Sequence, residues 1–144
     1  MKWANRVTIT ALSKDEPELT KEAVIALVGE NPVKISKVQG FNEQMITKFE
    51  VIIKKASSIN QFFKMFFSKL KKQQLEVLIS QIESRLDERH NLFIRIDKEA
   101  WIEERKLFLT DSGDCFHIRI SLAVFPSKSE IAAAKSKELL ESFL

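Results

Sequence analysis

The segment 92–97 reads Leu-Phe-Ile-Arg-Ile-Asp, and the segment 115–121 reads Cys-Phe-His-Ile-Arg-Ile-Ser. Apolar and polar side chains alternate in both segments, which predicts two half-buried strands because successive side chains of a strand point to opposite faces. One face of each strand would supply aliphatic side chains and Phe116 to a core. The opposite face would carry Phe93, Arg95, His117 and Arg119. The two segments therefore predict a sheet with one covered face and one open face.

Apolar periodicity also predicts the remaining elements. The other strands indicated by alternation cover residues 3–12, 33–39, 45–56 and 105–109, and the last strand would run on to Phe125. The strands at 33–39 and 45–56 would form a hairpin around Gly40, Phe41 and Asn42. The helices indicated by a period near 3.6 cover residues 14–28, 59–70, 75–86 and 128–143, with one helical turn at 98–104. The expected capping boxes pair Ser13 with Glu16, Ser58 with Gln61, and Ser127 with Glu130.

Four phenylalanines stand in one helical stripe of the segment 59–70. They are Phe62, Phe63, Phe66 and Phe67. An aromatic stripe is a conceivable stacking surface for nucleic-acid bases, but stacking aromatics usually lie on sheets or in clefts. The helical spacing therefore favours a buried core.

The order of the elements indicates an α+β fold. Strands and helices come in mixed runs, which is typical of a two-layer sandwich with a mostly antiparallel sheet and helices packed on one face. The chain has 144 residues, 44% of them hydrophobic and 30% charged, and no Pro/Gly-rich linker, so residues 1–144 are expected to form a single domain. No run approaches the roughly 20 apolar residues of a membrane span, and residues 1–6 lack the apolar core of a signal peptide. We expect a cytoplasmic protein without membrane contact.

The composition excludes several classes of site. One cysteine, Cys115, allows no internal disulfide and no four-cysteine zinc site. Three separated glycines allow no P-loop or dinucleotide fingerprint, and two histidines exclude a histidine-rich metal site. Asp111 and Asp114 could hold Mg²⁺, although turns favour Asp for local hydrogen bonds as well. We therefore expect no bound metal and no cofactor.

A catalytic pair is not expected either. Cys115 and His117 are two residues apart in a predicted strand, which places their side chains at a spacing of about 7 Å. A Cys–His nucleophile pair needs hydrogen-bond reach, which this spacing does not readily provide. The sequence therefore predicts no catalytic residues and a protein that is not an enzyme.

The charge is unevenly distributed along the chain. Residues 51–75 contain six lysines and no carboxylate, whereas residues 76–104 contain eight acids and four bases. The six lysines are Lys54, Lys55, Lys64, Lys69, Lys71 and Lys72. A basic segment beside an acidic one can steer an anionic partner, but a run of lysines is also what a solvated helix face carries.

The open face predicted above suits single-stranded RNA. Arg and Lys neutralise phosphates, while Phe or a guanidinium plane stacks on unpaired bases. Lys48 and Lys54 on the hairpin strand would join the four residues of this face. Lys69, Lys71 and Lys72 would extend the positive track if the helix pair lay at the edge of the sheet. Alternatively, Arg95 and Arg119 pair with the carboxylates Asp97, Glu50 or Asp114 on a solvated sheet.

Two blocks of the sequence resemble a known family. The segment 85–98, Arg-Leu-Asp-Glu-Arg-His-Asn-Leu-Phe-Ile-Arg-Ile-Asp-Lys, is similar to the signature of an archaeal family of RNA-binding proteins predicted to be exosome-associated, and the segment 114–120, Asp-Cys-Phe-His-Ile-Arg-Ile, is similar to its second strand block. The resemblance implies a fold like that of ribosomal protein L-five. It also implies candidate RNA contacts at the positions that match the two motifs: Arg95, Asp97, Lys98, His117 and Arg119. His90 departs from the small turn residue that the family often has there.

These observations lead to one main hypothesis and one alternative. The main hypothesis is a non-catalytic RNA-binding protein that uses a basic sheet face and is associated with the exosome or the ribosome. Its candidate RNA contacts are Phe93, Arg95, Lys98, His117, Arg119, Lys54, Lys71 and Lys72. The alternative is a protein-interaction module that docks on a larger RNA-processing assembly through a sheet edge or an exposed Phe/Leu helix face. The sequence leaves the oligomeric state open, a dimer included.

Overall fold

A five-stranded sheet with the strand order β2-β3-β1-β5-β4 organises the chain. All four strand pairs are antiparallel. The computed structural model describes residues 2–40, 42 and 44–144. The strands are β1 (Ala4–Ser13), β2 (Lys34–Gln39), β3 (Met45–Ile53), β4 (Asn91–Asp97) and β5 (Cys115–Leu122). The helices are α1 (Pro17–Val28), α2 (Ala56–Lys69), α3 (Lys72–Ser80), α4 (Ile82–Arg85), α5 (Lys98–Glu104) and α6 (Ser129–Glu141).

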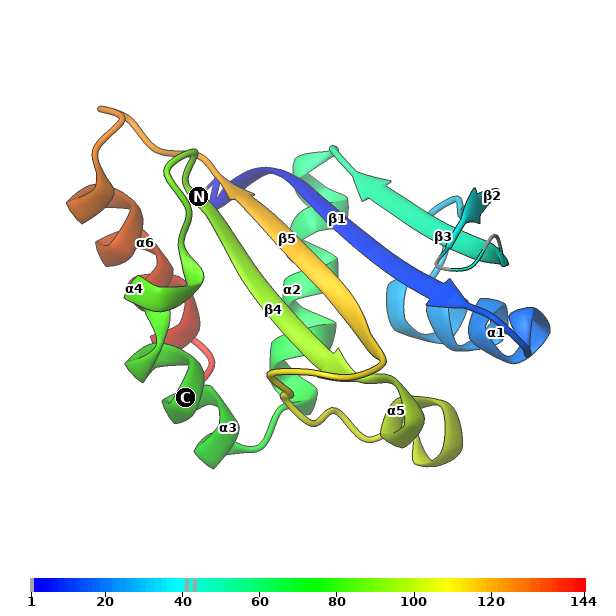
Figure 1. Ribbon diagram of the computed structural model, residues 1–144. Helices are drawn as coiled ribbons and strands as arrows, with labels where there is room; N and C mark the ends of the chain where they lie inside the picture. Colours follow the sequence, from blue (N-terminus) through cyan, green and yellow to red (C-terminus); the bar gives the residue numbers. More distant parts are fainter. Residues whose placement is uncertain (1, 41, 43) are drawn as a thin grey trace.

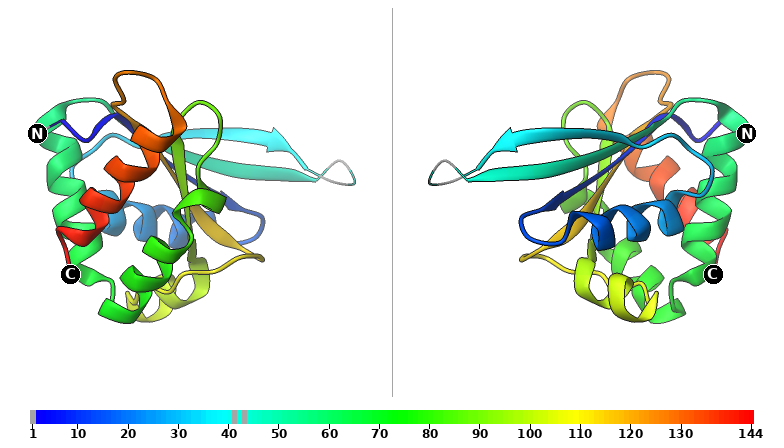
Figure 2. Two further views of the ribbon diagram at one scale, coloured as in Figure 1. Left: turned by 90° about the vertical axis from the view of Figure 1, so that its left-hand side faces the viewer. Right: turned by 90° about the vertical axis from the view of Figure 1, so that its right-hand side faces the viewer.

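The helices form a second layer against the sheet, and the predicted two-layer α+β sandwich is confirmed. Figure 1 shows α2 crossing behind the strands, while the face of the sheet toward the viewer is uncovered. Figure 2 shows that the β2–β3 hairpin reaches out from the sheet on the side away from α2 and α6. None of the helices in the described residues is long and apolar enough to span a bilayer.

The phenylalanine stripe of α2 lies in the core, as its spacing predicts. The four side chains are between 0% and 3% exposed. The Phe62 and Phe66 rings stack with centroids 5.4 Å apart, and Phe67 meets Phe66 edge-on at 5.2 Å. The layer beneath them is the covered face of the sheet, where residues such as Ile9 and Ile118 are at most 1% exposed. Burial of these rings fixes α2 against the sheet and leaves the opposite face free.

The three predicted capping boxes are wrong. The N-cap of α1 is Glu16 rather than Ser13. α2 begins at Ala56, before Ser58, and α6 begins at Ser129. In none of these three helices does the side chain of the N-cap residue bond to the backbone. Ile59 is 1% exposed and lies in the first turn of α2, so the helix begins two residues before Ser58. A side-chain cap does occur at α5, where the Asp97 carboxylate accepts from the Ala100 amide at 3.0 Å.

The predicted strand at 105–109 is also wrong. Arg105 takes a left-handed conformation (φ 54°) and ends α5, and only Leu109 forms an isolated bridge, to Ile96. The segment instead lies along the outer edge of β4, where Asp97 donates its amide to Phe108 and Thr110 donates to Arg95. It therefore covers an edge strand rather than extending the sheet.

The predicted hairpin at 33–56 is confirmed with shorter strands. β2 pairs with β3 from Lys34–Glu50 to Gln39–Met45. Gly40 precedes the turn, and a side chain at this position would displace the end of the Ile46 side chain. Phe41, which was expected in this turn, lies outside the described residues. The predicted helix 75–86 is present as two pieces, α3 and α4, separated at Gln81.

Candidate functional site

The uncovered side of the sheet, called the open face below, brings together the residues predicted from strand alternation. Phe93 on β4 lies directly opposite Arg119 on β5, and Arg95 lies opposite His117. β1 continues these rows, since Thr8 lies opposite Arg119 and Thr10 opposite His117. Directly paired side chains on one face of an antiparallel sheet are about 5 Å apart at Cβ. The predicted division of the two faces is therefore confirmed.

The middle of the open face is a row with apolar ends and a cation within it. Across four neighbouring strands this central row runs Phe93, Arg119, Thr8 and Ile52. Phe93 is 39% exposed and Ile52 42% exposed, so both present apolar surface to solvent. The Thr8 hydroxyl is buried and has no hydrogen-bond partner among the described residues. The row offers a stacking surface beside a guanidinium group.

The alternative that the two arginines pair with nearby carboxylates is wrong. Among the described residues, neither Arg95 nor Arg119 forms an ion pair. Arg95 donates to the backbone oxygen of Asp111 at 3.0 Å. The three proposed partners are engaged elsewhere: Glu50 with Lys48, Asp114 with Lys98, and Asp97 with the start of α5. The positive charge of the open face is thus available to an anion.

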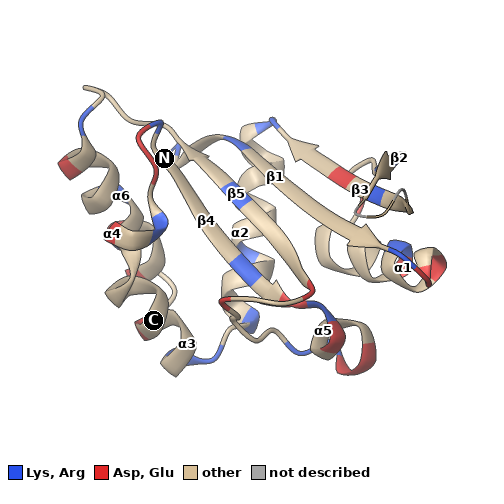
Figure 3. Ribbon diagram, in the orientation of Figure 1, with Lys and Arg blue, Asp and Glu red and all other residues tan. Residues whose placement is uncertain are grey.

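A basic hollow of about 610 Å³ lies at the end of the open face where β1 and β4 begin. Its lining consists of Asn5, Arg6, Lys54, Arg89, Asn91, Arg119, Ser121 and Leu122. Four of these side chains are cationic and none is acidic. The sheet register explains the convergence, since Ser121 lies opposite Asn91 on one side and Arg6 on the other. Figure 3 shows basic positions on the strands and strand ends around this part of the sheet.

Hydrogen bonds around Asp87 hold one wall of the basic hollow. The Asp87 carboxylate accepts from the amides of Arg89 and Asn91 at 2.9 and 2.8 Å, and from Nδ2 of Asn91 at 3.0 Å. Ser121 donates its hydroxyl to Oδ1 of Asn91 at 2.7 Å. Partial burial would raise the pKa of Asp87, but the hydrogen bonds from Asn91 and Arg89 outweigh it and lower the pKa below its ordinary value. The turn that carries Arg89 is therefore fixed by an ionised carboxylate.

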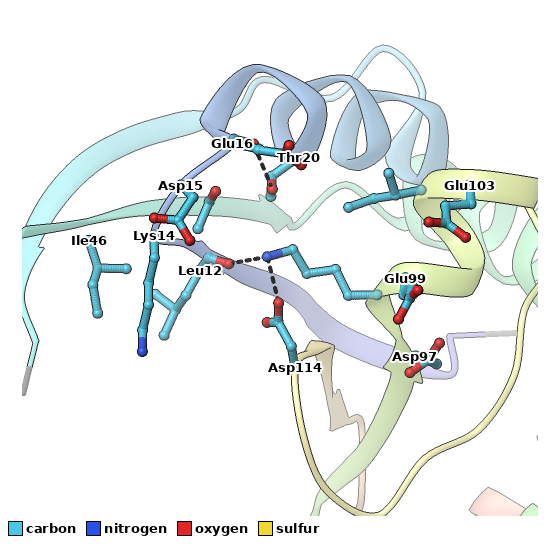
Figure 4. Close-up of a pocket in the computed structure, with 13 residues that line it drawn as sticks. Leu12, Lys14, Asp15, Glu16, Thr20, Ile46, Asp97, Glu99, Glu103 and Asp114 are labelled. Carbon is cyan, nitrogen blue, oxygen red and sulfur yellow. Dashed lines mark hydrogen bonds and ion pairs between the residues drawn. The ribbon is translucent and has the colours of Figure 1, made fainter.

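The opposite end of the sheet is acidic. An open cleft of about 780 Å³, the acidic cleft, lies between β1, α1 and α5. Its carboxylates are Asp15, Glu16, Asp97, Glu99, Glu103 and Asp114. The ammonium group of Lys98 lies between Asp114 and the backbone carbonyl of Leu12, and Figure 4 shows Asp15, Glu99 and Glu103 on the elements around it. An anionic ligand is repelled here and attracted to the basic hollow, so the electrostatic field gives the open face a direction.

Sequence comparison places this molecule among known proteins. A family described as RNA binding matches residues 6–122. The chain belongs to this RNA-binding family. It is 27% identical over 134 residues to RNA-binding protein PAB1135 of Pyrococcus abyssi (strain GE5 / Orsay), a match that covers 88% of this chain and 86% of that protein. The resemblance to an archaeal RNA-binding family is confirmed.

Solved structures share the fold of this RNA-binding family member. Protein AF2318 of Archaeoglobus fulgidus is 30% identical with a TM-score of 0.86, over 94% of this chain and 99% of that one. Mth689 of Methanothermobacter thermautotrophicus is 20% identical with a TM-score of 0.80, over 96% of this chain and 98% of that one. At this identity, the likeness to Mth689 shows only that the two chains share a fold.

Lys98 does not belong to the surface that this RNA-binding family member presents. The prediction from its motif position is contradicted, because Lys98 is only 7% exposed. Its ammonium group donates to the Leu12 carbonyl at 2.6 Å and to Asp114 at 3.0 Å. The strand alternation ends at Asp97, and the first turn of α5 carries Lys98 inward. Lys98 joins β1 to α5 and lies among the carboxylates of the acidic cleft, away from the open face.

Lys71 and Lys72 do not extend the open face either. They are exposed at the connection between α2 and α3, which lies in the helical layer of this family member (Figure 1). Lys69, just before them, sits over the Trp101 ring at 5.4 Å. The condition under which these lysines would extend the positive track, a helix pair at the edge of the sheet, is not met, because α2 packs behind the strands. Lys54, in contrast, does reach the basic hollow.

The Cys115–His117 distance differs from the expectation. Sγ of Cys115 lies 3.5 Å from Nε2 of His117, because the two side chains lean toward each other along the strand. Burial raises the pKa of the Cys115 thiol, while burial and the nearby Arg95 lower the pKa of His117. Both groups are therefore held in their neutral forms near pH 7, which is the opposite of an activated thiolate–imidazolium pair.

The two aspartates considered as Mg²⁺ ligands do not act together. Asp114 pairs with Lys98, whereas Oδ1 of Asp111 lies 3.8 Å from the Arg85 guanidinium. Within the part of the chain that the structure describes, no group of three or more His, Cys, Asp or Glu residues could hold a metal ion.

Sequence reasoning missed two cations of the basic hollow, Arg6 and Arg89. Arg6 precedes Val7 in an alternating segment, so its outward direction could have been read from the sequence. Arg89 stands in a turn, and no local pattern places a turn residue beside a strand that comes 80 positions earlier in the chain. Only the pairing of β1 with β5 and of β5 with β4 brings the two arginines to one end of the sheet.

Proposed function

We propose that this chain binds single-stranded RNA through the open face, as a non-catalytic factor. The observation that carries the proposal is the cross-strand pair of Phe93 and Arg119, a half-exposed aromatic ring beside a cation without an ion-pair partner in the described residues. Membership of the RNA-binding family and the likeness to an RNA-binding protein of Pyrococcus abyssi support the same activity. A ring on an open sheet favours unpaired bases, because a duplex hides its base faces.

The electrostatic field favours one placement of the RNA. The basic hollow would attract phosphates at one end of the open face, and the acidic cleft would repel them at the other. The RNA would then cross β4, β5 and β1 near the central row. The end of the sheet next to α5 would stay free of RNA. The neutral forms of Cys115 and His117 support binding without catalysis.

A salt titration tests the proposal. Replacing Arg95 and Arg119 by alanine should weaken binding of a fluorescent RNA oligonucleotide and flatten the log–log salt slope by about 1.4, at roughly 0.7 per lost phosphate contact for single strands. Lys71→Ala with Lys72→Ala removes the same charge from the helical layer and serves as the matched control, with the slope unchanged. Circular dichroism checks the fold of each variant. Normal folding and unchanged RNA affinity in the arginine variant would refute the role of the open face.

A second candidate function is docking on a larger RNA-processing assembly without RNA contact. The side chain of Phe125 is 95% exposed in the segment after β5, and β2 is an edge strand on a projecting hairpin. Both are features that a protein partner recognises. A docking face formed by the Phe stripe of α2 is not available, because these side chains are buried. If the unmodified chain shows no RNA binding at low salt, this candidate takes the lead.

We propose in addition that RNA binding serves an assembly such as the exosome or the ribosome. The support is the family resemblance of the blocks 85–98 and 114–120. A protein–protein contact with such an assembly neutralises fewer phosphates than RNA binding does. The affinity of that contact should therefore depend on salt less steeply than the affinity for RNA. Titrating the purified assembly with the R95A/R119A variant separates RNA binding by the open face from protein docking. Docking through the β2–β3 hairpin or Phe125 should be retained in this variant.

A further inference from the structure

We propose that the basic hollow holds the terminal phosphate of an RNA chain, a phosphomonoester, so that the protein recognises an RNA end. This inference rests on the proposed function and names the part of the RNA that the site selects. It concerns the end of the open face lined by Arg6, Lys54, Arg89 and Arg119.

The first argument is the charge of the hollow. Within the described residues, none of its four cations forms an ion pair, and its lining contains no carboxylate. An internal phosphodiester brings one negative charge, whereas a phosphomonoester brings about −1.5 to −2 near pH 7 and three terminal oxygens. Guanidinium groups bind such oxygens through paired, charge-assisted hydrogen bonds. A terminal phosphate therefore matches this cluster better than one internal linkage does.

The second argument is that the wall of the hollow is built before a ligand arrives. Asp87 receives three hydrogen bonds from Arg89 and Asn91, and Asn91 in turn accepts from Ser121. The Asp87 carboxylate is absent from the lining of the hollow and lines the neighbouring surface depressions instead. Its negative charge thus holds the turn that carries Arg89 without occupying the anion site. A preformed site loses less conformational entropy on binding.

The third argument is that the loops beside the hollow are hydrogen-bonded to one another. The segments around it are tied together at this end of the sheet. Leu122 donates its amide to the His90 carbonyl at 3.1 Å, and Ala123 donates to Trp3 at 3.0 Å. Nε2 of His90 lies 2.8 Å from the Ser127 hydroxyl. Figure 1 shows these connections meeting beside the N-terminus, beyond the ends of β4 and β5. These hydrogen bonds fix the loops that border the basic hollow, so its position at this end of the sheet is set before a ligand binds.

The position of Phe93 agrees with an end-bound nucleotide. Phe93 is two residues along β4 from Asn91, which lines the hollow, and this corresponds to about 7 Å along a strand. Both side chains belong to the open face. A nucleotide with its phosphate in the hollow can therefore place its base against the Phe93 ring. The two contacts together would define the terminal residue of the RNA.

The test compares RNA oligonucleotides of one sequence and one internal fluorescent label. One carries a 5′-phosphate, one a 3′-phosphate, and one hydroxyls at both ends. We expect one of the two phosphorylated forms to bind about tenfold more tightly than the hydroxyl form, the effect of one charged hydrogen-bonded contact. Arg89→Gln should abolish this preference while keeping the backbone bond from residue 89 to Asp87. Lys64→Gln, an equal charge change at an exposed position of α2, should keep it.

The possible outcomes separate this inference from the proposed function. Equal affinity for all three oligonucleotides would overturn recognition of the end and leave RNA binding intact. A phosphate preference that Arg89→Gln retains in full would overturn the assignment to the basic hollow. An unmodified chain that binds none of the three at low salt would overturn the proposed function and this inference with it. Loss of the preference in Arg89→Gln, with RNA binding otherwise retained, supports both.

Discussion

Replacing Phe93 by alanine should separate base stacking from phosphate binding on the open face. The ring is 39% exposed and lies opposite Arg119 across the β4–β5 pair. Stacking of one base on an aromatic side chain contributes about 1–3 kcal/mol by alanine substitution. At about 1.4 kcal/mol per tenfold, the affinity for single-stranded RNA should fall roughly 5- to 150-fold. The salt slope should stay unchanged, because no cation is removed.

The same substitution should leave the fold nearly unaffected. Phe93 points away from the core, so its removal opens no internal cavity, and cross-strand pairs on a sheet contribute about 0.2–1 kcal/mol. Arg119→Ala is the matched variant, since it removes the opposite member of the same pair. It should flatten the salt slope by about 0.7. In the same titration, Phe93→Ala should change the affinity alone. Arg119→Ala should change both the affinity and the salt slope.

The assay is fluorescence anisotropy with one labelled single-stranded RNA at several KCl concentrations, and urea unfolding provides the stability control. Phe93→Leu adds a second comparison, because it keeps an apolar side chain and loses the ring. Wild-type affinity in Phe93→Ala would refute the stacking role. A flattened salt slope in Phe93→Ala, equal to that of Arg119→Ala, would show that the substitution disturbs the arginine, and the reasoning from separate contacts would fail.

Three further predictions concern the framework of the site. Phe66→Ala should lower the free energy of unfolding by about 3–5 kcal/mol in urea, because it leaves a cavity at a fully buried position; unchanged stability would contradict the core assignment. Lys98→Met should lower the melting temperature, because it leaves the Leu12 carbonyl without its donor, while RNA affinity stays the same; lost affinity in a stable variant would restore Lys98 as a contact. Because the pKa of Asp87 is lowered in the folded state, its carboxylate adds to the free energy of unfolding above the ordinary aspartate pKa of about 3.9. This contribution is lost as pH falls through the lower pKa of the folded state. The free energy of unfolding of Asp87→Asn should therefore fall less than that of wild type when both are titrated with acid; an equal fall would contradict the role of Asp87.

The composition of the open face could be predicted from the sequence, because it depends on a local rule. Side chains two residues apart in a strand share a face, so the pairs Phe93–Arg95 and His117–Arg119 follow from alternation alone. The register that sets Phe93 opposite Arg119 could not be derived in this way. It depends on where β4 and β5 pair, and the chain between them contains a helix and an irregular segment whose length gives no register.

Local rules failed where the chain changes from one period to another. Lys98 follows an alternating strand, yet it is the first residue of α5 and lies inward. The serines at positions 13, 58 and 127 have the spacing of capping boxes, but the burial of apolar side chains sets where the helices begin. Such residues have tertiary contacts that outweigh local preference, since most helical stability in proteins comes from packing of an apolar face.

The chain carries a net charge of only +3, yet the fold gathers basic side chains at one end of the sheet and acidic side chains at the other. Arg6, Lys54, Arg89 and Arg119 come from four separate segments and meet at one end, while the carboxylates of the acidic cleft gather at the other. Neighbouring strands are about 4.8 Å apart, so the central row from Phe93 to Ile52 spans about 14 Å. A row that short contacts only a few nucleotides, which limits the affinity that stacking alone can supply. A charged anchor beside the row, which includes Arg119 of the row itself, is therefore the feature that would let so small a surface hold an RNA chain in a defined position.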